Sequence, residues 1–73
     1  MFKPGQLLQT RSFESIMVCE VEPVYHSPIG DVLYIGPDEL MLAIECSKAN
    51  SILWIILYNE KLICVNCYEV ESV

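Results

Sequence analysis

The chain has 73 residues, of which 53% are hydrophobic and 19% are charged, and ten acidic residues against four basic ones give a net charge of −6. This length corresponds to one domain over residues 1–73, and the charged fraction lies below the roughly 25% that is usual in soluble domains. Because the four basic residues are scattered, the composition argues against direct binding to nucleic acid. The acidic excess is suited to a protein partner with a basic surface, or it only keeps an apolar chain soluble.

Membrane insertion and secretion are not expected from the pattern of apolar residues. The longest apolar run covers residues 52–58, whereas a membrane-spanning helix needs about 20 residues. Near the start of the chain, Pro4, Gly5 and Gln6 interrupt any apolar stretch that could serve as a signal peptide. We therefore expect a cytoplasmic protein with mostly reduced cysteines.

Pro and Gly residues divide the first half of the chain into segments too short for stable helices. The predicted elements are strands over 6–10, 17–22 and 32–35, a loop over 26–30 and a turn over 36–39. Within the second of these strands, alternation places Met17, Cys19 and Val21 on one face.

The second half is rich in β-branched and aromatic residues, which favour strands. Strands are predicted over 40–46, 52–58 and 61–65, followed by a short strand or single helical turn over 68–70. A helix over 38–46 is an alternative, because Asp38 could cap it. We favour the strand because the next two segments pair with it as a meander. Asn59 and Glu60 form the tight turn, or part of a turn one residue longer, since Gly usually occupies the second position.

Pairing residues 40–46 with 52–58 predicts two apolar faces. The predicted core face contains Leu40, Leu42, Ile44 and Cys46 opposite Tyr58, Ile56, Trp54 and Ile52. The second face carries Met41, Ala43, Leu53, Ile55 and Leu57. Antiparallel sheets normally have polar residues on their outer face, so either another segment of the chain covers this surface or a partner does.

A partner contact is the hypothesis that we develop, because large exposed apolar patches usually mark contact sites. The predicted interface residues are Met41, Leu53, Ile55, Leu57 and, beside the predicted loop, Tyr25. The partner would be a second copy, giving a homo-oligomer, or a foreign protein.

No catalytic, cofactor or metal site is predicted. Cys64 and Cys67 form a single CxxC motif, whereas a structural zinc site usually has two such pairs. His26 is the only histidine, and we do not interpret its neighbour Ser27 as the nucleophile of a catalytic pair. We interpret the acidic pairs Glu20/Glu22 and Asp38/Glu39 as a solvated edge and a turn.

Three segments resemble small SH3-like β-barrel proteins of the kind that phages often encode. Residues 2–8 resemble the start of the first strand of such barrels, residues 38–45 their middle strand, and residues 54–61 their W-x-V-L-x-N-G-K hairpin, with Glu60 in place of Gly. The resemblance implies an all-β domain, either a five-stranded SH3-like barrel or a strongly bent antiparallel sheet. It also implies a binding or assembly role and carries over no catalytic residue.

Together these features predict a non-enzymatic protein–protein interaction module. Its role would be host takeover or virion assembly in the cytoplasm of the host cell if a phage encodes it. It would act through the apolar sheet face, with acidic residues at the rim. One alternative is an acidic inhibitor that mimics nucleic acid in the basic groove of a host enzyme. Another is a small redox or metal protein built on Cys64 and Cys67.

Overall fold

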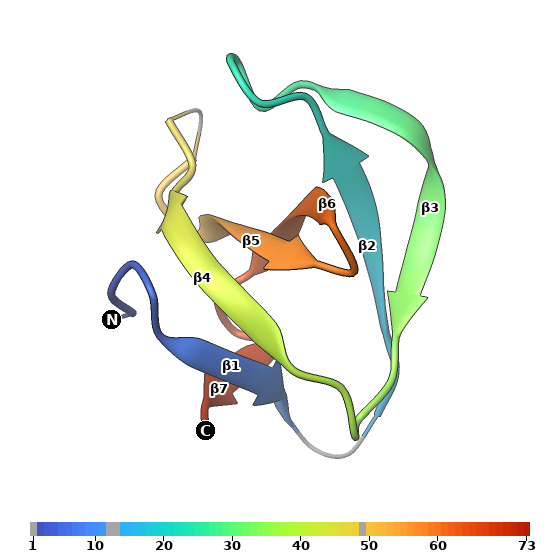
Figure 1. The fold of residues 1–73 in the computed structure, drawn as a ribbon, viewed down its shortest axis with the longest axis vertical. Coiled ribbons are helices and arrows are strands. Elements are labelled where there is room, and N and C mark those ends of the chain that lie inside the picture. The colour runs from blue at the N-terminus through green and yellow to red at the C-terminus, as the bar shows by residue number, and fades with distance from the viewer. Residues whose placement is uncertain (1, 12–13, 49) are drawn as a thin grey trace.

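The computed structural model describes residues 2–11, 14–48 and 50–73, which form one antiparallel sheet of seven strands and no α-helix. The strands are β1 (Leu7–Thr10), β2 (Ile16–Val21), β3 (Pro28–Ile35), β4 (Met41–Cys46), β5 (Leu53–Tyr58), β6 (Lys61–Asn66) and β7 (Val70–Ser72). Their order across the sheet is β3-β2-β6-β5-β4-β1-β7, so β3 and β7 form its two edges. Figure 1 shows how strongly the sheet bends, with β2 and β3 curving away from the β5–β6 pair.

The predicted all-β class and the strongly bent antiparallel sheet are confirmed. The helix considered for residues 38–46 is wrong, because β4 occupies Met41–Cys46. The described residues form seven strands in place of the five that the resemblance implied. Strand β3 starts at Pro28, inside the predicted loop, and β7 starts at Val70, where the last predicted element was expected to end.

The register between β4 and β5 differs from the predicted one. Leu42 lies opposite Leu57, and Ala43 lies opposite Ile56, whereas the sequence pattern predicted Leu42 opposite Ile56. A shift of one residue moves every side chain of a strand to the other face of the sheet. Met41 is accordingly 1% exposed and Ala43 is fully buried. The prediction that these two residues lie on an exposed face is therefore wrong.

A β-bulge in β4 explains why the predicted side-chain orientation is correct again at the end of the strand. The register shifts between Ala43 and Glu45, and Cys46 then lies opposite Trp54. The extra residue of a bulge reverses the alternation of side chains that follow it. Cys46 consequently packs against the core, as predicted.

The core lies on the inner face of the bent sheet and receives side chains from all seven strands. It is made of Leu8, Ile16, Val18, Ile35, Met41, Ala43, Trp54, Ile56, Ile63, Val65 and Val70. Phe2 adds an edge-to-face contact with Trp54, at a ring-centroid distance of 5.7 Å and an interplanar angle of 76°. Burying an aliphatic or aromatic side chain contributes about 1.5–3 kcal/mol, so this cluster is the main source of stability.

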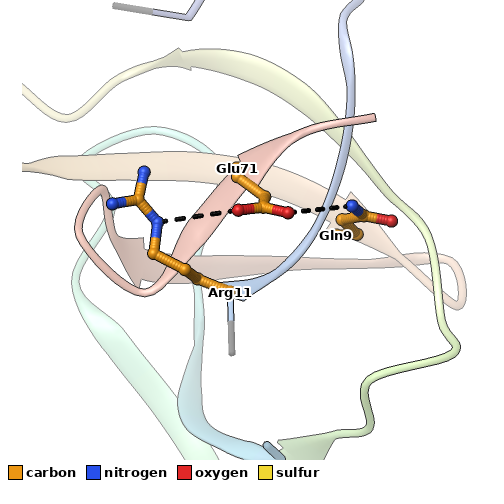
Figure 2. Close-up of polar contacts among 3 residues, drawn as sticks. All are labelled: Gln9, Arg11 and Glu71. Atoms are coloured by element: carbon orange, nitrogen blue, oxygen red, sulfur yellow. Dashed lines mark hydrogen bonds and ion pairs between the residues drawn. The ribbon is translucent and has the colours of Figure 1, made fainter. Parts of the chain in front are cut away.

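The β7 edge is held to β1 by side chains as well as by the backbone. Gln9 Nε2 donates a hydrogen bond to Glu71 Oε2 at 3.0 Å, and Arg11 Nε lies 3.8 Å from Glu71 Oε1 (Figure 2). The Arg11 amide also donates to the Glu69 carbonyl at 2.9 Å. These contacts engage one of the four basic residues within the chain.

Candidate protein-binding site

The face of the sheet that points away from the core is apolar across several strands. Directly opposed residues of antiparallel strands share a face, and β2 pairs Met17 with Tyr34 and Cys19 with Val32 of β3. On its other side, Cys19 lies opposite Cys64 of β6. We call the face that carries these residues the outer face.

The outer face continues from β6 onto β5 and β4. Cys64 lies opposite Ile55, and Leu62 lies opposite Leu57, which in turn lies opposite Leu42. The outer face therefore continues across five neighbouring strands, from the edge strand β3 through β2, β6 and β5 to β4.

An open groove of about 440 Å³ lies among residues of β2, β3, β5 and β6 and of the segments that follow β4 and β6. We refer to it as the groove. Its lining is largely apolar and consists of Met17, Val18, Cys19, Val21, His26, Pro28, Val32, Ser47, Leu53, Cys64, Asn66 and Glu69. Ligand-binding sites are typically apolar grooves or pockets with a few polar groups, and the groove fits this description.

The five predicted interface residues are not brought together. Met41 belongs to the core. Leu53 lines the groove, and Leu57 is exposed on the outer face. Ile55 also belongs to the outer face but is fully buried, so it cannot contact a partner directly. Tyr25, at 79% exposure, lies in the turn between β2 and β3.

The edge strand β3 supplies site residues that the sequence pattern did not identify. Val32 and Tyr34 are exposed, Tyr34 by 68%, and Met17 beside them on β2 is also exposed. The alternation of Met17, Cys19 and Val21 indicated one apolar face of β2, but Pro28 and Gly30 obscured the full length of β3. Only the pairing of β2 with β3 shows that these residues share one surface.

The turn between β2 and β3 is organised by the carboxylate of Glu22. Its oxygens accept hydrogen bonds from the amides of Val24 at 3.0 Å, of Tyr25, and of Ser27 at 3.5 Å. These backbone hydrogen bonds, that of Val24 foremost, hold the pKa of Glu22 below its ordinary value. Glu22 therefore stabilises this turn, and the turn places Tyr25 at the tip of the hairpin.

A second carboxylate, Glu39, fastens the turn before β4. It accepts hydrogen bonds from the Tyr58 hydroxyl and, at 2.7 Å, from the Gly36 amide. The bond from Tyr58 lowers the pKa of Glu39 most, and the same bond raises the pKa of Tyr58. Both predicted acidic pairs thus contain one residue that stabilises a turn.

The cysteines are arranged differently from the CxxC pattern. Cys64 lines the groove, whereas Cys67 packs against the core. On β2, the residue directly opposite Cys64 is Cys19, and burial followed by the charge of Cys19 raises the pKa of the Cys64 thiol. Within residues 2–11, 14–48 and 50–73, no group of three or more His, Cys, Asp or Glu side chains could hold a metal ion.

Comparisons with known protein families, curated proteins and solved structures gave no match. The part of the chain that the structure describes contains no helix long and apolar enough to cross a membrane. The functional proposal is consequently drawn from the residues of this chain alone.

Proposed function

We propose that this protein is a non-enzymatic protein–protein interaction module that binds an extended, basic segment of a partner protein along β3 and the groove. The observation that carries the proposal is the continuity between the groove and a sheet edge, because Val32 lines the groove and belongs to the edge strand β3. An extended segment that pairs with a sheet edge gains affinity from backbone hydrogen bonds and specificity from alternate side chains.

The exposed backbone edge supports this binding mode. Strand β3 pairs with β2 and lies at the end of the sheet order. Pro28 and Asp31 protect its first half, since proline and charged residues discourage unwanted pairing at an edge. Residues 32–35 provide the more regular half. A segment paired there would place alternate side chains beside Val32 and Tyr34, on the outer face.

Charge supports a basic partner in preference to a second copy. The net charge of −6 opposes the approach of two copies and favours a partner that carries Lys or Arg. Glu69 lies in the groove lining itself, and Glu45 lies opposite Ile55 on the outer face. The hypothesis of a nucleic-acid-mimicking inhibitor stays a prediction, with no observation here that favours it.

Selection from a library of short random peptides displayed on phage tests the proposal. Peptides enriched on the immobilised protein should alternate apolar residues and contain Lys or Arg. Binding should weaken at high salt, which screens exposed charges. In NMR titrations with a selected peptide, the largest shifts should fall on the amides of β3 and of the groove.

Matched variants identify the surface. Val32→Lys removes an apolar contact and repels basic peptides, so affinity should fall about tenfold or more. Val73→Lys makes the same change at an exposed position beyond the β7 edge and should leave affinity unchanged. Equal binding to both variants, or no enrichment of peptides, would reject the site. Light scattering shows whether the wild type is a dimer and whether Val32→Lys converts it to a monomer. That result would identify a second copy as the occupant of the site and would contradict the proposal of a basic partner.

A further inference from the structure

Two cysteines that are far apart in the sequence meet at the junction of the two hairpins. The junction between β2 and β6 consists of the pairs Cys19–Cys64 and Glu20–Ile63. Both cysteines are free, both are half-buried, and both line the groove. Both cysteines therefore border a space that a small reagent can enter.

The register suits a covalent bond between these two residues. Opposed residues of antiparallel strands have Cα atoms about 4.5 or 5.5 Å apart, and disulfides form when the Cα atoms are about 4.4–6.8 Å apart. The register therefore predicts a Cα separation for Cys19 and Cys64 that lies within the range of disulfides.

The other two cysteines are engaged elsewhere. Cys46 packs against the core and donates a hydrogen bond to the Ser51 carbonyl at 3.4 Å. Cys19 donates a similar bond to the Glu20 carbonyl at 3.3 Å, so packing against the core, and not this bond, distinguishes Cys46. Cys67 also packs against the core, next in the sequence to the exposed Tyr68. Of the two cysteines in the CxxC motif, Cys64 lines the groove and Cys67 packs against the core. The cysteine that lies opposite Cys64 in the sheet is Cys19.

We propose that Cys19 and Cys64 form a dithiol that low-molecular-weight disulfides oxidise to a cross-strand disulfide. The thiolate of one cysteine attacks a sulfur atom of the small disulfide, which forms a mixed disulfide and releases one small thiol. The thiolate of the second cysteine then attacks the protein sulfur of that mixed disulfide and displaces the second small thiol. Both cysteines are oxidised, the small disulfide is reduced to two thiols, and these carry away the two protons.

The bond would lock the two hairpins together where few backbone pairs join them. It would also close a long loop, residues 19–64, in the unfolded chain, which stabilises the folded state. Where the surroundings are reducing, disulfides are usually transient and either catalytic or redox-sensing. This inference does not depend on the proposed peptide binding, because it rests on the register of β2 and β6.

Treatment of the folded protein with oxidised glutathione tests the inference. The double variant Cys46→Ser/Cys67→Ser retains only the two cysteines of interest, and its circular dichroism spectrum should match that of the wild type. We expect it to lose two hydrogen atoms by mass spectrometry. Trypsin without reductant should then give a cross-linked pair of fragments, 12–48 and 62–73. The urea midpoint should rise on oxidation and return on treatment with dithiothreitol.

Further variants exclude other outcomes. When Cys19→Ser is added to the double variant, oxidation should stop at a glutathione adduct on Cys64, and the urea midpoint should not rise. If the double variant does not fold, the single variants Cys46→Ser and Cys67→Ser carry the same fragment mapping. A bond confined to fragment 62–73 would join Cys64 to Cys67 and overturn the inference. Free thiols or stable adducts on both cysteines of the double variant would overturn it as well.

Discussion

The β5–β6 hairpin and the β2–β3 hairpin are both apolar, yet they occupy opposite kinds of position. The β5–β6 hairpin is paired without interruption from Leu53–Asn66 to Tyr58–Lys61 and has a strand on each side. The β2–β3 hairpin ends at a sheet edge, and β2 bulges between Cys19 and Val21. Position in the sheet, more than composition, therefore decides whether an apolar strand stabilises the fold or remains available for contact.

The turns of the two hairpins are stabilised in different ways. Asn59 and Glu60 have φ angles of 50° and 64°, so the β5–β6 turn is a two-residue turn with positive φ at both central positions. The alternative of a longer turn is thus wrong. The β2–β3 turn depends on the Glu22 carboxylate. The first turn is held by backbone conformation, which is independent of pH. The second adds to its backbone hydrogen bonds those that the titratable Glu22 carboxylate accepts.

The largest contrast between the hairpins should appear in the cost of truncating an apolar side chain. Ile56→Ala empties a fully buried position of β5 and should lower the free energy of unfolding by about 2–5 kcal/mol. Val32→Ala, at an exposed position of β3, should cost about 0.5 kcal/mol or less. Urea denaturation followed by Trp54 fluorescence measures both. Similar losses would show that the edge hairpin contributes to the core as much as the central one.

The second contrast concerns the turn of the central hairpin. An L-residue with left-handed backbone conformation costs about 1–2 kcal/mol, and Glu60 has a φ of 64°. Glycine removes this strain but loses about 0.5–1 kcal/mol of backbone entropy. Glu60→Gly should therefore raise the free energy of unfolding by about 0.5–1 kcal/mol. Lys61→Gly, one residue later at the start of β6, should lower it. A loss of stability in Glu60→Gly would contradict the two-residue turn.

The central hairpin was predictable from sequence because its pattern is local. Residues 52–58 form a continuous run of aliphatic and aromatic residues that favours a strand, and Asn59 marks the turn before the next strand over 61–65. The range of β4 was predictable but its register against β5 was not, because the bulge between Ala43 and Glu45 leaves no mark in residues 40–46, where Glu45 alone is polar. That single extra residue decides whether Met41 faces the core or the outer face.

The candidate site was predictable only in part. Leu53 and Leu57 were correctly placed on the face opposite Trp54, because β5 pairs with β6 without a register shift, so its side chains alternate between the two faces. The contributions of Val32 and Tyr34 depend on which strand β2 pairs with. That pairing is a long-range choice, and the Pro28 and Gly30 signals suggested a loop. The Cys19–Cys64 pair was missed for the same reason, whereas the nearby Cys67 attracted attention through sequence spacing alone.

The smallest contrast is a difference in acid sensitivity between the two turns. The pKa of Glu22 is lowered in the folded state, so its contribution to stability is fully present above its ordinary value of about 4.5 and is lost as the pH falls through the folded-state pKa. Glu39 titrates in the same direction, so the wild type should lose stability through both residues. Glu22→Gln should lower the urea midpoint slightly at neutral pH and flatten its decline below pH about 4.5.

Amide exchange localises this effect, because the Glu22 carboxylate accepts hydrogen bonds from the amides of Val24 and Tyr25. Those amides should exchange faster in Glu22→Gln, while the amides of Ile56 and Ile63 in the central hairpin should be unaffected near neutral pH. Glu14→Gln removes the same charge at an exposed position and should change neither observation. If Glu22→Gln and Glu14→Gln change the decline of the urea midpoint at low pH equally, net charge would account for the acid sensitivity. A carboxylate-held turn predicts instead that only Glu22→Gln loosens the hairpin tip, which is where Tyr25 is presented.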